Sequence, residues 1–259
     1  MKTKKPTKGS IESYRKIVDE SMPQLSINCV IFRYYDKKLQ YAAVQFTGSK
    51  MQVIPGGYIF QNESIDDAAR RNLYEQTNMD DLILHQFGSF GSHNRRITAS
   101  NSDIENIGIP EDFRNWMEQR FVTIAYYSII SDPNTEIIAN APYSNADWLD
   151  IEGKDRLAMD HSEIVGQARK ALARDLLSRP VLLSFMPACF TIPELQKLHE
   201  AILGRSVDRG NFRKRVLKSG FLVKTGLVKE NTGQRPPELY QINKERYLTS
   251  LTEDVKLGF

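Results

Sequence analysis

The chain lacks the features of a membrane or secreted protein. No apolar stretch approaches the ~20 residues that a helix needs to cross a bilayer. The first ten residues, MKTKKPTKGS, are basic and polar, and no apolar run follows them, which argues against a secretory signal. We therefore expect a cytoplasmic protein in which residues 1–20 form a disordered basic tail.

Cysteine and histidine are also scarce. The two cysteines, Cys29 and Cys189, lie far apart in apolar surroundings, so we expect two buried thiols in a reducing compartment rather than a disulfide framework. The four histidines do not have the spacing of metal ligands. The sequence therefore predicts no metal site and no required cofactor.

The chain does have apolar material for sizeable cores and an uneven distribution of charge. Its 259 residues, 41% of them apolar, suffice for one large domain or two ordinary ones. The net charge is +3, but residues 180–259 hold 13 basic and 8 acidic side chains, whereas residues 9–179 hold 18 and 24. This asymmetry predicts that the two halves of the chain meet different partners.

The N-terminal half of the chain has β-rich segments. Residues 26–35 and 39–46 flank a short turn, which predicts a hairpin, and residues 146–151 suggest a strand or turn. The long polar segment 92–119 is either functional or a solvated surface excursion. A helix that starts near Asp160 and stops before Pro180 is expected to connect two domains over residues 160–180. Further strands are expected at residues 51–55, 82–91 and 121–130.

Residues 57–79 combine a helical pattern with a fixed spacing of glycine, arginine and carboxylates. Apolar side chains at the three- and four-residue spacing of a buried stripe predict an amphipathic helix over residues 63–76. The order Gly57, Glu63, Arg71, Leu73 and Glu75 resembles the Nudix box, whose helix carries carboxylates that bind Mg²⁺ or Mn²⁺. The resemblance implies a Nudix fold.

Three positions of that box have been replaced. Asn72, Gln76 and Asn78 stand where the family has Glu, Glu and Gly, and neutral amides hold a divalent cation poorly. Losing a positioned acid or base typically removes ~10²–10⁴-fold of rate. We therefore expect no enzyme, and Mg or Mn is needed only if residual hydrolase activity remains. The vestigial box consists of Gly57, Glu63, Arg71 and Glu75.

The C-terminal region has helix caps and strands in the order of a winged helix-turn-helix. Thr191 and Glu194 form a capping box that opens a helix ending at Gly204. Asp208 caps a second helix, which stops at Gly220. Two strand-like runs then bracket a turn that contains glycine and proline, as in a wing.

The second helix of this module has an apolar side and a basic side. Phe212, Val216 and Leu217 group on one arc at ~100° per residue. Between positions 205 and 235 the chain has nine basic and two acidic side chains. Cations neutralise phosphates, and Asn or Arg can read base edges with two hydrogen bonds. The predicted DNA-binding residues are Arg205, Arg209, Asn211, Arg213, Lys214, Arg215, Lys218 and Arg235.

Together the two motifs resemble the Nudix-related transcriptional regulators, in which a degenerate Nudix domain is fused to a winged helix. The resemblance implies an α+β protein: a Nudix α/β/α sandwich with a mixed sheet over residues 21–159 and a winged helix-turn-helix over 181–259. It also implies a bacterial homodimer that represses or activates transcription at a double-stranded DNA operator. A sugar or an ADP-ribose-like effector would bind the Nudix domain. Candidate effector-binding residues are Gly56, Gly57, Phe90, Arg120 and Tyr126.

Two other interpretations remain open. The first is a Nudix hydrolase that acts on ADP-ribose or a related nucleoside diphosphate derivative. The second is a protein-interaction scaffold built on an inactive Nudix domain. Metal-dependent turnover that disappears in Glu75→Gln would favour the hydrolase, whereas duplex binding that weakens steeply with salt would favour the regulator.

Overall fold

The structure, a computed structural model, describes residues 8–95, 109–140, 142–154, 157–178, 183, 185–230 and 236–252. None of the helices in these ranges is long and apolar enough to cross a membrane. The chain divides into two compact units. Unit 1 comprises Met1–Phe32, Tyr41–Ser128 and Glu136–Ala168. Unit 2 comprises Arg33–Gln40, Ile129–Thr135 and Arg169–Phe259. The domain limits 21–159, 160–180 and 181–259 remain predictions.

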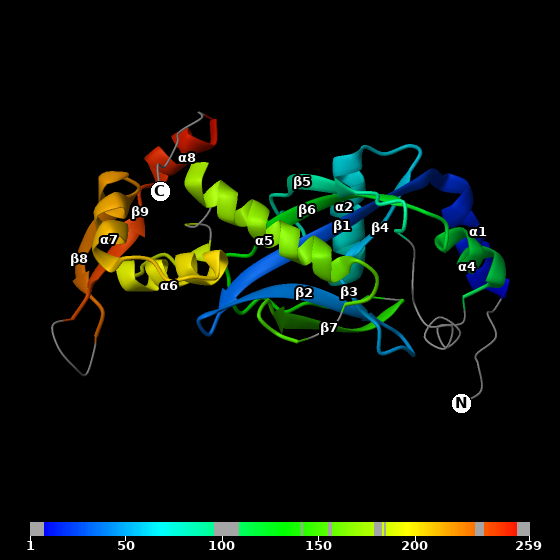
Figure 1. The fold of residues 1–259 in the computed structure, drawn as a ribbon, viewed down its shortest axis with the longest axis horizontal. Helices are drawn as coiled ribbons and strands as arrows, with labels where there is room; N and C mark the ends of the chain where they lie inside the picture. The colour runs from blue at the N-terminus through cyan, green and yellow to red at the C-terminus, as the bar shows by residue number, and fades with distance from the viewer. Residues whose placement is uncertain are drawn as a thin grey trace. The chain divides into compact units, whose positions relative to one another are not determined.

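A seven-stranded sheet forms the centre of the N-terminal region (Figure 1). Its strands follow the order β3-β2-β1-β6-β5, while β4 pairs with β1 and β7 pairs with β2. The expected hairpin joins β1 to β2 through Asp36 and Lys37, both of which have a left-handed φ. The strands are β1 Ser21–Tyr35, β2 Lys38–Phe46, β3 Gln52–Val53, β4 Gly56–Phe60, β5 His85–Phe90, β6 Val122–Ile129 and β7 Tyr143–Asp150.

Helices cover both faces of this sheet. Side chains alternate along β1, so neighbouring residues face opposite sides. Ile27 and Cys29 are buried with the alanines of α2 (Ile65–Thr77) in one apolar cluster. Asn28 lies between them, and its amide meets the first residue of α5 (His161–Ser178) on the other face. The arrangement is the expected α/β/α sandwich.

The helix α2 begins two residues later than the sequence pattern suggests. Ser64 is its N-cap and accepts a hydrogen bond from the Asp67 N–H at 3.1 Å, so Glu63 lies in the turn before the helix. Asn78 ends the helix with a left-handed φ of 55°. Asparagine tolerates this conformation better than most residues, which explains how it replaces the glycine of the family pattern.

The N-terminal segment departs from expectation. Residues Lys8–Glu20 form α1, so the predicted disordered tail is wrong for residues 8–20, while residues 1–7 lie outside the described ranges. The ring of Tyr14 packs 4.6 Å from that of Phe113 on α4 (Glu111–Met117). Contact with α4 covers the apolar side of α1. The remaining residues of the polar segment that precedes α4, 96–108, are not described.

Unit 2 has the helices and strands of a winged helix-turn-helix. Its helices are α6 Ile192–Leu203, α7 Arg209–Lys218 and α8 Lys244–Thr252, and its strands are β8 Leu222–Val228 and β9 Glu238–Ile242. The predicted capping box of α6 and the caps Gly204 and Asp208 are confirmed. Phe212 and Val216 are buried, but Leu217 is 38% exposed, so its assignment to the apolar side is wrong. Cys189 is exposed, also against expectation, whereas Cys29 is buried.

Candidate effector pocket and nucleic-acid interface

The Gly56–Gly57 turn is fastened to α2 by the side chain of Gln76. The Gly56 N–H donates to Gln76 Oε1 at 3.0 Å, and Gln76 Nε2 donates back to the Gly56 carbonyl oxygen. A carboxylate at position 76 could accept the first bond but could not donate the second. The amide that replaces the family's glutamate therefore fixes the turn and has no free oxygen directed at a cation.

Asn72 has a similar role, one helical turn before Gln76. Its Nδ2 donates to the carbonyl oxygens of Tyr58 at 3.1 Å and Ala68 at 2.8 Å. A Cβ atom at Gly57 would lie 2.0 Å from Asn72 Oδ1, so only glycine lets β4 approach α2 this closely. A carboxylate at position 72 would face two carbonyl oxygens with no proton to donate.

The charged residues of the vestigial box form a clamp. Arg71 donates to Glu63 through Nε at 2.9 Å and Nη2 at 2.6 Å, to Glu75 through Nη1 at 3.2 Å, and to the Tyr58 carbonyl. The hydrogen bond from Arg71 holds the pKa of Glu63 below its usual range. The carboxylates are thus engaged by an arginine. Within the described ranges, no group of three His, Cys, Asp or Glu side chains could hold a metal ion, and these residues do not fit the Mg²⁺ or Mn²⁺ of a Nudix hydrolase.

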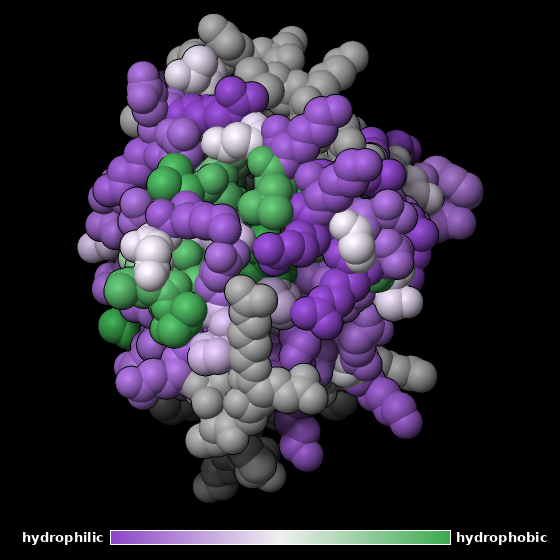
Figure 2. Space-filling model, turned by 90° about the vertical axis from the view of Figure 1, so that its left-hand side faces the viewer, coloured by the Kyte–Doolittle hydropathy of each residue, from purple (hydrophilic) through white to green (hydrophobic). Residues whose placement is uncertain are grey.

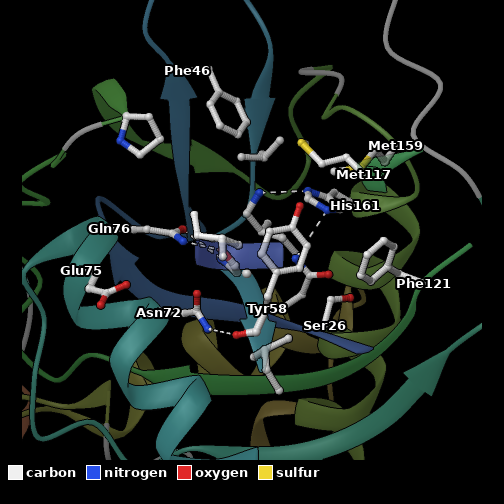
Figure 3. Close-up of a pocket in the computed structure, with 18 of the residues that line it drawn as sticks. Ser26, Phe46, Tyr58, Asn72, Glu75, Gln76, Met117, Phe121, Met159 and His161 are labelled. Atoms are coloured by element: carbon white, nitrogen blue, oxygen red, sulfur yellow. Dashed lines mark hydrogen bonds between the residues drawn. The ribbon is translucent and has the colours of Figure 1, made fainter. Parts of the chain in front are cut away.

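A pocket of about 300 Å³ opens beside this box, and the described residues that line it all belong to unit 1. Figure 3 shows Tyr58 near its centre, with Asn72 and Gln76 on one side and His161 on the other. Hydroxyls and amides alternate with apolar and aromatic side chains in its wall. Such a lining suits a ligand with hydroxyl groups and planar rings.

His161 is a buried member of this wall. Its Nδ1 accepts a hydrogen bond from the Ile54 N–H at 3.2 Å, and its Nε2 faces the Asn28 amide at 3.4 Å. Asn28 Oδ1 in turn accepts from the Thr123 hydroxyl at 2.9 Å. Burial lowers the pKa of His161 to about 4. The ring is therefore neutral at physiological pH.

Among the described residues, the arginines of the pocket wall are Arg71 and Arg95, and both have carboxylate partners. Arg95 donates to Asp160 through Nε at 2.6 Å and Nη2 at 3.2 Å, and its Nη1 bonds the Phe121 carbonyl. Arg71 is bonded to Glu75 within the clamp. An anionic ligand would therefore have to replace a carboxylate at one of these arginines. The pair of Arg71 with Glu75 is the more exposed, at 24% and 56%, against 11% and 23% for Arg95 and Asp160.

Aromatic rings from α1, α4 and β4 cluster at one side of the pocket, where Trp116 packs against the lining residues Tyr58, Phe113 and Phe121. The ring centroids of Tyr58 and Trp116 lie 4.5 Å apart, and those of Trp116 and Phe121 lie 5.1 Å apart. Phe113 joins this group between Tyr14 and Trp116. We call this group of rings the aromatic cap. Because α1 and α4 supply its rings from distant segments of the sequence, the cap depends on both helices.

The effector candidates chosen from the sequence fall into two groups. Gly56 and Gly57 line the pocket. Phe90, Arg120 and Tyr126 are absent from its described lining: Tyr126 is 2% exposed, and its hydroxyl bonds Asp66 beneath α2. Arg120 donates to the Gly91 carbonyl, and Phe90 packs against Phe87.

Sequence reasoning missed several pocket residues. Tyr58 follows Gly57 inside the box, so its position was a signal for a side chain near the site. Asn28 lies in a strand otherwise rich in apolar residues, and a polar residue there is a second signal. His161 and the aromatic residues of α4 gave no comparable signal, because only the folded chain brings them to the box.

The predicted DNA-binding side chains lie on an exposed surface of unit 2. Asp208 caps α7 by accepting from the Asn211 N–H at 2.8 Å. Seven of the eight predicted residues are exposed on α7 or in the turn before it, and Arg235 lies outside the described residues. Lys224 and Lys229, on or directly after β8, add cations that sequence reasoning did not select. In the space-filling view, hydrophilic side chains cover most of the face shown (Figure 2). The exposed predicted residues are Arg205, Arg209, Asn211, Arg213, Lys214, Arg215 and Lys218.

Comparison with known proteins agrees with both halves of this description. Residues 182–242 match the family model described as the NrtR DNA-binding winged helix domain. Over 237 residues, 88% of this chain and 86% of the relative, the chain is 28% identical to the "ADPR responsive transcriptional repressor NtrR" of Acinetobacter baylyi.

Solved structures give the same result. The crystal structure of Shewanella oneidensis NrtR complexed with a 27mer DNA is similar with a TM-score of 0.64 and 27% identity, covering 87% of this chain and 96% of that one. A MutT/nudix family protein from Enterococcus faecalis shares the fold, with a TM-score of 0.61, 22% identity and coverage of 92% and 94%.

The fold and the site thus define a Nudix-type domain followed by a winged helix-turn-helix domain. This pair of domains and these relatives make the chain similar to the Nudix-related transcriptional regulators.

Proposed function

We propose that the chain is a DNA-binding repressor whose Nudix domain binds an ADP-ribose-like effector that changes its affinity for an operator. The observation that carries the proposal is the exposed basic side of α7 in a winged helix that matches the NrtR domain model. The same similarity supports a bacterial, cytoplasmic homodimer on a double-stranded operator, because the relatives are a transcriptional repressor and a DNA-bound regulator.

The pocket of unit 1 is the proposed effector site. The name of the Acinetobacter relative supports ADP-ribose rather than a free sugar. In this site the aromatic cap would stack on a planar ring, and Asn28 and Gln119 would meet hydroxyl groups. The diphosphate would take the place of Glu75 at Arg71, the more exposed of the two arginine pairs.

The Nudix domain is proposed to be non-catalytic. Asn72 and Gln76 could offer a metal only neutral amide oxygens, and that of Gln76 already accepts the Gly56 N–H. Only Glu75 remains as a carboxylate among the three helix positions of the box. Its partner Arg71 would compete with the cation.

Effector binding would act by favouring one arrangement of the protein over another, since a ligand with equal affinity for both does not shift the equilibrium between them. The helix α5 is the proposed connection. Its residues up to Ala168 belong to unit 1, and those from Arg169 belong to unit 2.

Duplex binding measured by fluorescence anisotropy tests this function. Wild type should lose ~10³–10⁵-fold in affinity between about 50 and 200 mM salt if ~6–10 phosphates are contacted. Lys214→Ala should reduce the salt slope by about 1, and Asn211→Ala should cost about 1–3 kcal/mol on the preferred sequence alone. Lys16→Ala, an exposed charge change on α1, is the matched control and should alter neither value.

The response to effector is tested by adding ADP-ribose to the same duplex-binding measurement. ADP-ribose should change duplex affinity, while arabinose should not, and no AMP should be released in the presence of Mg²⁺ or Mn²⁺. Brisk metal-dependent turnover with no duplex binding would replace this proposal with a hydrolase.

A further inference from the structure

A carboxylate lies between α7 and the β8–β9 sheet of unit 2. Glu238 is the first residue of β9, and its Oε1 accepts a hydrogen bond from Lys224 Nζ on β8 at 2.8 Å. Its Oε2 accepts from the Tyr240 hydroxyl at 2.8 Å and lies 3.7 Å from Arg213 Nη2 on α7. One acidic side chain thus engages a cation from the helix and a cation from the sheet.

The position of Glu238 is fixed more firmly than that of an ordinary surface carboxylate. Tyr240 is 1% exposed, so its hydroxyl is held by the core. Strand pairing sets Lys224 directly opposite Tyr240, which keeps the lysine stem beside the carboxylate. Hydrogen bonds from Lys224 and Tyr240 hold the pKa of Glu238 below its usual range, so it is ionised at neutral pH.

A carboxylate in this place opposes DNA binding. Arg213 is one of the predicted DNA-binding residues, and Lys224 extends the same basic set onto the sheet. Each cation that neutralises a phosphate contributes about 0.9 to the slope of log affinity against log salt. A cation already paired with a carboxylate contributes less, and the carboxylate itself repels phosphate.

We propose that Glu238 is a specificity-determining residue that limits the sequence-independent DNA affinity of unit 2 by engaging Arg213 and Lys224. The inference rests on the proposed DNA-binding function and goes beyond it, because it assigns an opposing role to an acidic side chain within the basic surface. Glu238 acts through the two cations and need not touch DNA.

Glu238→Gln tests the proposal, because glutamine keeps the size of the side chain and an acceptor for Tyr240 while removing the charge. Affinity for a mixed-sequence duplex should rise at about 50 mM salt, and the salt slope should steepen by about 0.9 for each cation released. Between about 50 and 200 mM, the variant should therefore lose about 3–4-fold more affinity than wild type for one cation and about 10-fold more for two.

Glu245→Gln on α8 is the matched control, since it makes the same charge change at an exposed residue. In a second variant, which combines Glu238→Gln with Arg213→Ala, the salt slope should be about 0.9 less steep than in Glu238→Gln alone. Thermal unfolding of each variant verifies that it is folded.

The outcomes separate the two proposals. Equal slopes for Glu238→Gln and Glu245→Gln would overturn this inference and leave the DNA-binding function standing. Weaker binding by folded Glu238→Gln would also overturn it, because the carboxylate would then be presenting the cations to DNA. Wild type that binds no duplex would overturn both.

Discussion

At positions 72 and 76 the chain carries amides where its family carries carboxylates, and the difference lies in what each group can donate. Asn72 and Gln76 each offer N–H groups to backbone carbonyls that a carboxylate would repel. The replacement of the two carboxylates therefore has a structural consequence. The same two side chains now hold the turn and β4 against α2.

The first prediction concerns Gln76→Glu, which restores the family residue. The carboxylate would leave the Gly56 carbonyl without its donor and place a charge in a buried position. We expect the free energy of unfolding to fall by ~1–3 kcal/mol in urea denaturation.

Gln61→Glu is its matched control. The Gln61 amide also donates to a backbone carbonyl, that of Asp19, but at an exposed site. Solvent can satisfy both groups there, so the cost should be smaller. Equal losses in the two variants would contradict the role given to Gln76.

The second prediction is a pH dependence due to His161. Its pKa is about 4 in the folded chain and about 6.5 when exposed. Between these values the unfolded chain binds a proton that the folded chain does not, so stability falls as the pH falls from 6.5 to 4. The contribution present above pH 6.5 amounts to about 3 kcal/mol.

His161→Asn tests this assignment, since Asn retains an acceptor for the Ile54 N–H. Denaturation at several pH values should show a flatter dependence between pH 4 and 6.5 than in wild type. His93→Asn, which removes an exposed histidine, should retain the wild-type slope. If both variants match wild type, His161 does not titrate as described.

Residues whose role depends on spacing were predictable, while those whose role depends on a bond across the fold were not. Gly57, Glu63, Arg71 and Glu75 follow a fixed interval that is measurable in the sequence itself. The bond between Gln76 and Gly56 requires the turn and α2 to be in place. Tyr126, an aromatic residue suited to stacking, is 2% exposed and bonds Asp66 of α2, which its position in the sequence did not indicate.

At the scale of elements, local caps were the most reliable signals. The capping box of Thr191 and Glu194 and the Asp208 cap of α7 involve residues three apart, so the sequence contains the whole motif. The helix α1 was missed because the basic and polar start of the chain suggested a disordered tail. Tyr14, Ile17 and Val18 do lie at helical spacing, but their partner α4 is about 100 residues away.

The third prediction treats α1 and α4 as one structural element of the pocket. Tyr14→Ala removes the ring that packs on Phe113 and should cost ~1–3 kcal/mol, less than for a fully buried aromatic residue. The emission of Trp116 should shift to longer wavelength as water reaches the cap, and ADP-ribose should bind more weakly. Lys16→Ala, an exposed change on α1 whose partner Glu20 lies in the same helix, should change none of these. Unchanged Trp116 emission in Tyr14→Ala would show that α1 does not shape the cap.

At the scale of the whole molecule, the order of domains was predictable and the pocket was not. Each domain has its own local motif, and the charge changes sign between them. The pocket gathers residues from α1, β1, β4, α2, α4 and the start of α5. Contacts over such separations leave no pattern in a single sequence, which is why His161 emerged only from the fold.

The helix α5 has a practical consequence for anyone who wishes to express either half alone. Truncation before residue 161 would delete His161 and leave the Ile54 amide without its acceptor. A C-terminal fragment that starts at residue 181 would lack Arg169, which donates to the terminal carbonyls of α6 at Ala201 and Ile202. Both fragments therefore need α5. An N-terminal fragment should end near residue 178, and a C-terminal fragment should begin near residue 161.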